Sequence, residues 1–254
     1  MWQGKTLAVV LPTYNEKDSI AECIRRFEAI PEVDQVIAIN NNAAEGTSEE
    51  IATTGATEIV ETTQGYGAAI KRGMRDAQTD LIAICEPDGT FAPEDLTKLL
   101  AFLPECDVVI GSRTVSNFIW RGANMGWFLQ WGNWAVAKLI ELLYNTNHLS
   151  DVGCTFRVMT KEHAEVILER SRLDGSAYGL EMLLISVISK ARMVQIPVNY
   201  HPRVGVSSVT GELGKTIALG TEMILLTLKM RLRARSIRRG LKTPKGPHRQ
   251  VRPS

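Results

Sequence analysis

The first 111 residues of this 254-residue chain alternate between short apolar segments and longer segments whose apolar side chains recur at helical spacing. The five apolar segments are residues 7–11, 36–39, 57–60, 81–85 and 108–111. Strands that alternate with helices in this way predict an α/β fold with a doubly wound, mostly parallel sheet flanked by helices. Such sheets bind ligands at the carboxyl ends of their strands, so we expect the functional residues directly after residues 11, 39, 85 and 111.

The helices between these strands are expected near residues 19–30, 50–52, 67–77 and 93–103, and Ser19 with Glu22 forms a capping-box pattern at the start of the first helix. The second half of the chain is less regular. It predicts a Trp-rich helix near 123–144, strands near 154–158 and 193–198, and helices near 161–169 and 180–190. We therefore divide the chain into one α/β domain (1–211), an amphipathic interfacial helix (212–239) and a disordered basic tail (240–254).

The charge of the chain is unevenly distributed. Residues 229–254 contain ten Lys or Arg and no Asp or Glu, so the remaining residues carry 19 basic and 28 acidic side chains, a net charge of −9. A basic tail on an acidic body indicates an anionic partner, either a membrane surface or a nucleic acid, although a simply solvated tail is equally compatible with this pattern. Because the tail has no interleaved aromatic residues, we expect no nucleic-acid partner.

Other features exclude several classes of protein. No apolar run reaches the 18 or so residues of a membrane-spanning helix, and the N-terminal residues lack the pattern of a signal peptide. The cysteines lie far apart and have no histidine at metal-ligand spacing. They predict reduced thiols in a cytoplasmic protein and exclude a zinc site or a disulfide scaffold.

Two carboxylates follow the fourth apolar segment. Glu86 and Asp88 flank Pro87 at the expected end of a strand, and Gly89 permits a tight turn there. Carboxylates at this spacing can share Mg²⁺ or Mn²⁺, cations that accept oxygen ligands together with substrate phosphates. Taken alone, the pattern also fits a solvated loop start or a helix cap.

Two further segments suit a phosphorylated ligand. The first strand is followed by Thr13, Tyr14 and Glu16, an aromatic ring with hydrogen-bonding groups that would hold a base and ribose, or would equally make a capped turn. The Gly-rich turn at Gly65 enters a helix that carries Lys71, and a helix N-terminus is able to receive phosphate.

Taken together, seven motifs in the same order resemble those of the family 2 glycosyltransferases with a GT-A fold, and most closely those of the polyprenyl-phosphate sugar synthases. The likeness covers roughly residues 6–210. The motifs are VVLPTYNE (9–16), INNNAAEGT (39–47), QGYGAAIKRGM (64–74), CEPDGTFAPEDL (85–96), VIGSR (109–113), SDVGCTFRVMT (150–160) and IPVNYHPRVGVSS (196–208).

This resemblance implies a role for each matched residue. The metal on the donor diphosphate would be Mg²⁺ or Mn²⁺, held by Glu86 and Asp88, with Glu86 at a position where the family has Asp. Asn40 and Asn41 occupy two Asp positions that help to read the base. The nucleotide site would comprise Pro12, Thr13, Tyr14, Glu16, Asn40, Asn41, Gly65 and Lys71, and the acceptor phosphate would face Arg113, Arg121 and Arg203.

The function that the resemblance implies is metal-dependent, inverting transfer of a hexose from a UDP- or GDP-sugar to a polyprenyl phosphate. The alternative is transfer to the hydroxyl group of a soluble or cell-envelope polymer, with Asp151 as general base. Asp151 would equally serve as a cap or as a partner for Arg157. The sequence gives less support to a nucleic-acid-binding protein or to a catalytically silent scaffold. The intact pair of carboxylates argues against the scaffold.

Four tryptophans bear on the choice of acceptor. Trp120, Trp127, Trp131 and Trp134 lie close together in sequence, and the last three share one face of the expected helix. Aromatic residues at this spacing are either core or a belt at a membrane interface. With the basic C-terminal segment, we favour the interface and expect a cytoplasmic protein that binds the inner face of the cell membrane peripherally. A homodimer is left open.

Overall fold

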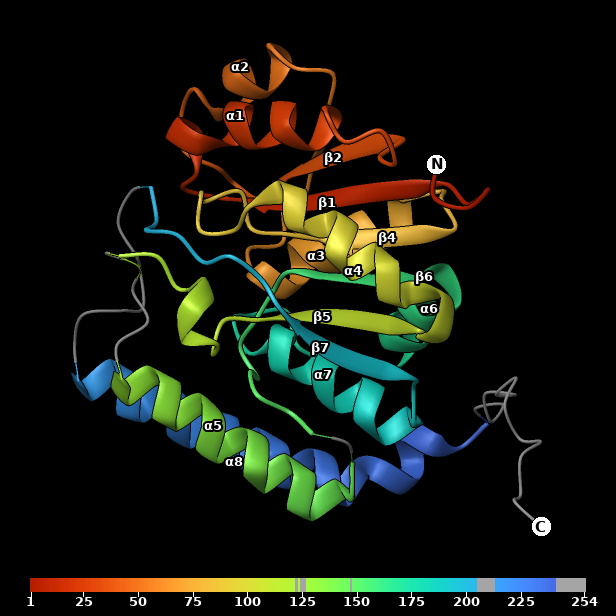
Figure 1. Ribbon diagram of the computed structural model, residues 1–254, viewed down its shortest axis with the longest axis vertical. Coiled ribbons are helices and arrows are strands. Elements are labelled where there is room, and N and C mark those ends of the chain that lie inside the picture. Colours follow the sequence, from red (N-terminus) through yellow and green to blue (C-terminus); the bar gives the residue numbers. More distant parts are fainter. Residues whose placement is uncertain (122, 124–126, 147, 205–212, 241–254) are drawn as a thin grey trace.

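The computed structural model describes residues 1–121, 123, 127–146, 148–204 and 213–240 and contains a seven-stranded sheet (Figure 1). The strand order is β3-β2-β1-β4-β6-β5-β7. β6 pairs antiparallel with β4 and β5, whereas every other neighbouring pair is parallel. The mostly parallel α/β fold is therefore confirmed. The strands are β1 (Leu7–Thr13), β2 (Gln35–Asn40), β3 (Thr57–Val60), β4 (Leu81–Ile84), β5 (Val108–Ser112), β6 (Arg157–Thr160) and β7 (Met193–Pro197).

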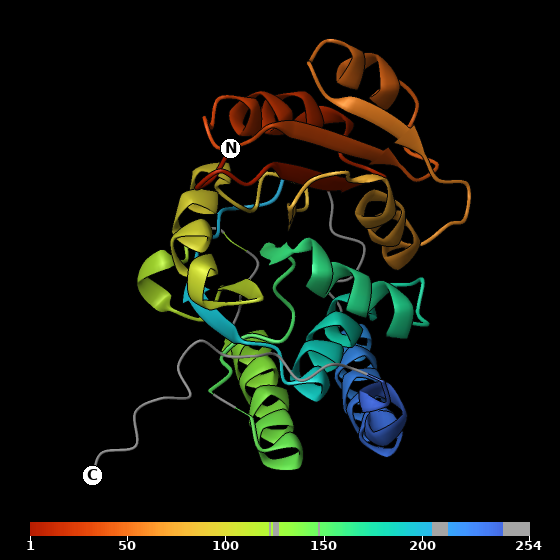
Figure 2. The ribbon, with the colours of Figure 1, turned by 90° about the vertical axis from the view of Figure 1, so that its right-hand side faces the viewer.

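Helices cover both faces of this sheet (Figure 2). One layer contains α3, α6 and α7, and the other contains α1, α2 and α4. Helices α5 and α8 lie side by side, with α8 against α7 and away from the sheet (Figure 1). The helices are α1 (Lys17–Glu28), α2 (Thr47–Ala52), α3 (Tyr66–Asp76), α4 (Leu96–Phe102), α5 (Trp127–Tyr144), α6 (Lys161–Arg170), α7 (Tyr178–Ser189) and α8 (Leu213–Arg238), with short 3-10 turns at Pro93–Asp95, Leu103–Glu105 and Ser116–Phe118.

The centre of the sheet is fully enclosed. All residues of β1 and β4 are buried, as expected of parallel strands with helices on both faces. Each buried Ile or Leu contributes roughly 1.5–3 kcal/mol to stability. Helix α3 approaches β1 so closely that a Cβ atom on Gly73 would lie 2.3 Å from Val10 Cγ1. This packing holds the start of α3 beside the carboxyl ends of β1 and β2.

The capping box expected at Ser19 and Glu22 is wrong. Helix α1 begins at Lys17, two residues earlier, and its N-cap residue Glu16 makes no side-chain capping bond. The Ser19 hydroxyl instead donates to the backbone oxygen of Pro87 at 2.6 Å. The local sequence pattern is overridden because Ser19 faces the loop that follows β4, and the bond ties α1 to that loop.

Helix α8 presents one buried stripe and one exposed face. Thr227, Met230, Ala234 and Ile237 recur at helical spacing and are buried, whereas Leu232 is 86% exposed. The Tyr144 hydroxyl at the end of α5 donates to the Thr227 oxygen at 2.7 Å, which fixes the two helices together. Among the described helices, none is long and apolar enough to cross a membrane. The basic tail expected beyond Gly240 lies outside the described residues.

Candidate active site

The residues expected at the carboxyl ends of the strands do lie there. Strands β1, β2, β4 and β5 end at Thr13, Asn40, Ile84 and Ser112. Strand β1 has β2 on one side and β4 on the other, and these two strands lead the chain in opposite directions across the sheet. This change of direction creates the crevice in which α/β sheets bind ligands.

Asp88 lies at the centre of this crevice and is almost fully buried. Its Oδ1 accepts hydrogen bonds from the backbone N–H and the hydroxyl of Thr90, at 2.9 and 2.6 Å. Its Oδ2 is buried without an aligned hydrogen-bond donor. The tight turn depends on Gly89, whose φ of 78° is in the left-handed region. The turn therefore leaves Oδ2 without an aligned donor, and its charge is met by an ion pair with Arg203.

Glu86 lies beside Asp88 and is half-buried. Burial, and then the negative charge of Asp88, raise the pKa of Glu86 to about 7, although Arg203 and Arg113 oppose this rise. A divalent cation would remove the repulsion between the two carboxylates.

These two carboxylates suit a shared cation. Across the described residues, no group of three or more His, Cys, Asp or Glu side chains comes together as a complete metal cage. Mg²⁺ and Mn²⁺ commonly take one or two carboxylates and complete their coordination with phosphate oxygens and water. Asp88 Oδ2, which has no aligned hydrogen-bond donor, and the neighbouring Glu86 fit a cation bound in this way.

Arg203 faces the same two carboxylates. Its Nη2 forms an ion pair with Asp88 Oδ2 and lies 3.4 Å from Glu86 Oε2. The segment that carries it is fixed to the loop after β4, since the N–H groups of His201 and Val204 donate to the oxygens of Thr90 and Asp88 at 2.7 and 2.9 Å. The structure thus brings Arg203 to the expected metal site.

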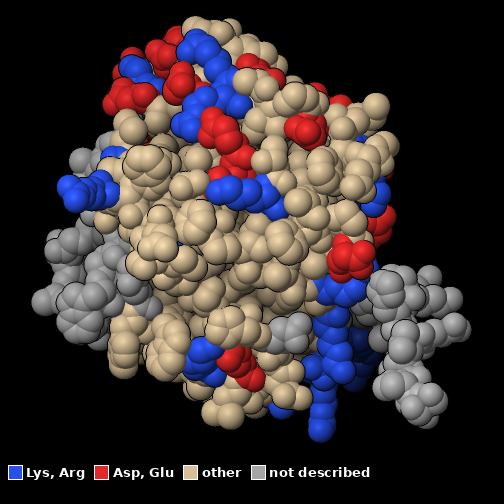
Figure 3. Space-filling view, viewed as in Figure 1, with Lys and Arg blue, Asp and Glu red and all other residues tan. Residues whose placement is uncertain are grey.

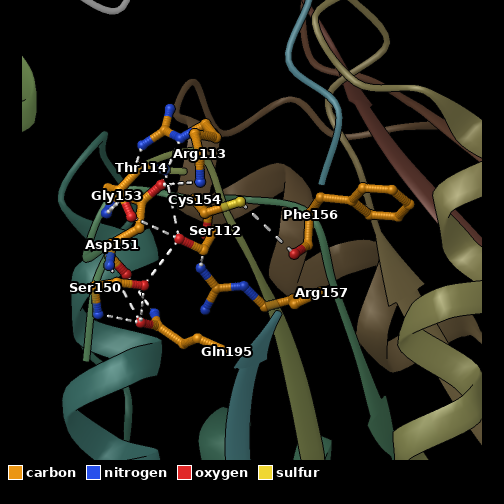
Figure 4. Close-up of polar contacts among 10 residues, drawn as sticks. All are labelled: Ser112, Arg113, Thr114, Ser150, Asp151, Gly153, Cys154, Phe156, Arg157 and Gln195. Atoms are coloured by element: carbon orange, nitrogen blue, oxygen red, sulfur yellow. Dashed lines mark hydrogen bonds and ion pairs between the residues drawn. The ribbon is translucent and has the colours of Figure 1, made fainter. Parts of the chain in front are cut away.

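Arg113 and Asp151 form a second buried pair, shown in Figure 4. The Arg113 side chain donates from Nε to Oδ2 at 2.8 Å and from Nη2 to Oδ1 at 3.0 Å. The backbone N–H groups of Arg113 and Gly153 also donate to the carboxylate, each at 2.9 Å. Burial would raise the pKa of Asp151, but the attraction of Arg113 outweighs burial and the pKa is lowered.

This arrangement limits what Asp151 can do. Each carboxylate oxygen accepts two hydrogen bonds, which together use the four acceptor positions of the group. The alternative in which Asp151 pairs with Arg157 is wrong. The fully buried Arg157 donates instead to the backbone oxygens of Cys154, Thr155 and Gly179. Asp151 therefore holds Arg113, whose guanidinium also lies 5.4 Å from the centre of the Tyr200 ring.

A glutamine supports this pair and was not expected from the sequence. Gln195 of β7 accepts hydrogen bonds from the N–H groups of Ser150 and Asp151 at 2.6 and 3.2 Å (Figure 4). Its side-chain nitrogen also donates to the Asp151 backbone oxygen. The available signal was one polar residue between Val194 and Ile196 in an otherwise apolar strand.

The loop after β1 forms another wall of the crevice. Pro12 and Thr13 are buried, and the Thr13 hydroxyl donates to the Leu11 oxygen at 3.0 Å. Tyr14 is 49% exposed, so its ring is available to a ligand. Glu16 Oε2 accepts from the N–H groups of Tyr14 and Asn15 at 2.7 and 2.9 Å, which shapes the loop.

Asn40 and Asn41 are engaged in holding the neighbouring loops. The Asn41 amide nitrogen donates to the oxygens of Glu61 and Thr63 at 2.8 Å, and its Oδ1 accepts from the Gly65 N–H at 2.8 Å. The Asn40 amide donates to Ser48 and Glu58 at 3.0 and 2.8 Å. Both side chains therefore order the β2 end of the crevice.

The start of α3 is occupied by the chain itself. The backbone oxygen of Asp174 accepts from the N–H groups of Gly67 and Ala68 at 2.7 and 3.1 Å. The Asp174 carboxylate forms an ion pair with Lys71. Asp174 therefore occupies the helix start after Gly65 and the Lys71 side chain, which the sequence suggested as a phosphate site. Nothing in the sequence around Asp174 predicted these contacts.

Arg121 is not brought together with the other arginines by any recorded contact among the described residues. It is exposed on the segment before α5, next to residue 122, which lies outside the described part of the chain. Arg113 and Arg203 are thus the two expected acceptor-facing arginines that the structure places around the crevice.

Comparisons with known proteins identify the family and the fold. The family model described as glycosyl transferase family 2 matches residues 8–168. An uncharacterised glycosyltransferase of Mycobacterium tuberculosis (strain H37Rv) is 31% identical over 220 residues, which are 85% of this chain and 95% of the relative. An undecaprenyl-phosphate mannosyltransferase of Micrococcus luteus is 27% identical over 241 residues, covering 89% and 97% of the two chains.

A dolichyl-phosphate hexose transferase of Haloferax volcanii is 26% identical over 230 residues, covering 89% of this chain and 96% of the relative. The fold also matches the crystal structure of glucosyl-3-phosphoglycerate synthase from M. tuberculosis with Mn²⁺, UDP and glucosyl-3-phosphoglycerate. The TM-score is 0.66 at 17% identity, over 90% of this chain and 80% of the other. The chain is therefore a glycosyltransferase of family 2 with a GT-A fold, close to the polyprenyl-phosphate sugar synthases.

Proposed function

We propose that this glycosyltransferase transfers a hexose from a nucleoside-diphosphate sugar to a polyprenyl phosphate at the cytoplasmic face of the membrane. The observation that carries the proposal is the state of Asp151, whose four acceptor positions are all used. A hydroxyl acceptor requires a general base, whereas a phosphate acceptor is already an oxyanion and requires only positioning. Two relatives, the dolichyl-phosphate hexose transferase and the undecaprenyl-phosphate mannosyltransferase, support the same acceptor class.

In this proposal each part of the crevice has a task. Pro12, Thr13, Tyr14 and Glu16 contact the nucleotide, with the exposed Tyr14 ring as a platform for the base. Glu86 and Asp88 would hold Mg²⁺ or Mn²⁺, which would supply positive charge to stabilise the leaving diphosphate. Asn40, Asn41 and Gly65 order the base end of the site, and Lys71 reaches it only if its ion pair with Asp174 opens.

The acceptor side depends on the arginines. Arg113 is held in one orientation by Asp151, so its guanidinium is available to orient phosphate oxygens without loss of side-chain entropy. The acceptor oxygen then attacks the anomeric carbon from the side opposite the diphosphate, and the configuration inverts. Arg203 and Arg121 are the further candidates for contact with the acceptor phosphate.

Exposed side chains on α5 and α8 support binding to a membrane surface. Trp131 and Trp134 are 59% and 51% exposed, which argues against a place in the core for these two residues. Ile224, Leu225 and Leu228 are exposed on α8, and arginines follow them along the helix. Figure 3 shows few charged side chains over α5 and a basic group towards the end of α8. Trp and Arg side chains at such a surface favour the interface of an anionic bilayer.

The test is consumption of UDP- and GDP-hexoses by the purified protein with Mg²⁺ or Mn²⁺, in the presence and absence of a short polyprenyl phosphate. We expect turnover that requires both the lipid and the metal and is lost in D88A. Donor binding without lipid-dependent turnover would refute the proposal, and hydroxyl acceptors would then be screened with D151N as the comparison variant.

A further inference from the structure

The guanidinium of Arg203 lies where a cation would bind the two carboxylates. Its Nη2 contacts Asp88 Oδ2 and lies 3.4 Å from Glu86 Oε2. Asp88 Oδ2 has no aligned hydrogen-bond donor, whereas Oδ1 is fully used by Thr90. The oxygen left over for a metal is therefore the oxygen that Arg203 neutralises.

This contact is built into the fold and does not depend on a freely moving side chain. The backbone N–H groups on both sides of Arg203, those of His201 and Val204, donate to Thr90 and Asp88 in the loop after β4. Close packing reinforces the arrangement, because a Cβ atom on Gly89 would lie 3.0 Å from Val204 Cγ2. The two loops are thus joined, and Arg203 extends from the joint onto the carboxylates.

Electrostatics explain why the site needs a resident cation. Two carboxylates separated by one proline in a largely buried loop repel one another. Arg113 favours the charged form of Glu86 only from a distance, because its own ion pair is with the buried Asp151. Within the part of the chain that the structure describes, Asp88 and Glu86 each form an ion pair with Arg203.

We propose that Arg203 is the internal counter-ion of the metal site and competes with the divalent cation for Asp88 and Glu86. Metal binding then requires the guanidinium to leave Asp88 Oδ2, so Arg203 lowers the metal affinity of the empty enzyme. Metal binding also frees the Arg203 guanidinium at the edge of the metal site when the donor diphosphate is bound. This inference rests on the proposed function only in placing the metal at Glu86 and Asp88.

The test is a titration of the purified protein with Mn²⁺ alone, followed by calorimetry or by the electron paramagnetic resonance signal of free Mn²⁺. Neither measurement depends on turnover. Removal of the competing cation should tighten Mn²⁺ binding about ten-fold in R203M, with R203K close to wild type because it keeps the charge. R26M is a matched control, since Arg26 pairs with Glu94 on the surface, and its Mn²⁺ affinity should equal that of wild type.

Two further variants make the result unambiguous. The double variant D88N/R203M should lose the gain in affinity, which would show that the tighter site is the one at Asp88. Circular dichroism would verify that each variant is folded. If R203M and wild type bind Mn²⁺ equally while D88N abolishes binding, the competition is refuted and the metal site stands. If D88N leaves Mn²⁺ binding unchanged, both the competition and the proposed metal site are refuted.

Discussion

Asp151 holds Arg113 by two side-chain hydrogen bonds of 2.8 and 3.0 Å and a third from the Arg113 backbone N–H. The pair lies at the end of β5, next to the crevice that contains Glu86 and Asp88. A carboxylate that is buried, fully hydrogen-bonded and of lowered pKa is a poor proton acceptor but a strong anchor. The relationship identifies Asp151 as a positioning residue for Arg113.

The variant D151N should therefore impair acceptor binding more than the chemical step. The neutral amide leaves a buried guanidinium without its counter-ion, and we expect the KM for the acceptor to rise at least ten-fold and the stability to fall by about 3 kcal/mol. Steady-state kinetics and urea unfolding measure the two effects. A loss of kcat at unchanged acceptor KM, with loss of the acidic limb of the pH–rate profile, would instead show that Asp151 is a general base.

The variant N41A should weaken donor binding. Asn41 joins the end of β2 to residues 61–65 through three hydrogen bonds, and its removal leaves two carbonyls and one N–H without their partner. We expect a several-fold rise in the KM for the nucleotide sugar and a loss of roughly 2 kcal/mol in stability. Q78A, which removes an exposed amide after α3, is the control. Unchanged donor KM in N41A would show that this end of the crevice does not contact the donor.

Exposed tryptophans on α5 should contribute to membrane binding. The double variant W131A/W134A is expected to reduce partitioning into anionic liposomes about ten-fold in a sedimentation assay, without a change in the circular dichroism spectrum. F102A removes an equally exposed aromatic side chain from α4 and should bind as wild type does. Equal partitioning of wild type and W131A/W134A would contradict an interfacial role for α5.

Acid should destabilise the protein partly through His163. Burial lowers the pKa of His163 to about 4, and its Nε2 lies 2.8 Å from Ser186 Oγ in α7. Because the unfolded chain takes up the proton at higher pH than the folded chain, stability falls as pH decreases from about 6.5 to about 4, by up to roughly 3 kcal/mol. Urea unfolding at pH 7.5 and 4.5 should show a smaller difference in H163Q. An equal difference in both proteins would contradict this contribution.

The order of elements and the residues at the strand ends could be predicted because they depend on local patterns. Apolar segments that alternate with helical spacing predict the sheet, and Thr13, Asn40 and Asp88 follow strands in the sequence itself. The pattern did not reveal that β6 is antiparallel to β4 and β5, because consecutive residues of β6 are buried just as they are in those two strands.

Contacts between distant segments could not be predicted in the same way. The pairing of Asp151 with Arg113, and the support from Gln195, depend on how β5 and β7 lie together in the sheet. Ser19 shows the same limit, since its local capping pattern is overridden by a hydrogen bond to Pro87, 68 residues away. The start of α3 was expected to offer N–H groups to a phosphate, and Asp174 from the loop before α7 takes two of them.

In the proposed function the acceptor is a phosphate that requires no base. The most direct measurement compares sugar transfer from the preferred nucleotide sugar to a polyprenyl phosphate and to the polyprenol of the same length, with the same protein, metal and detergent. We predict transfer to the phosphate and none above background to the alcohol. Comparable transfer to the alcohol would contradict the account.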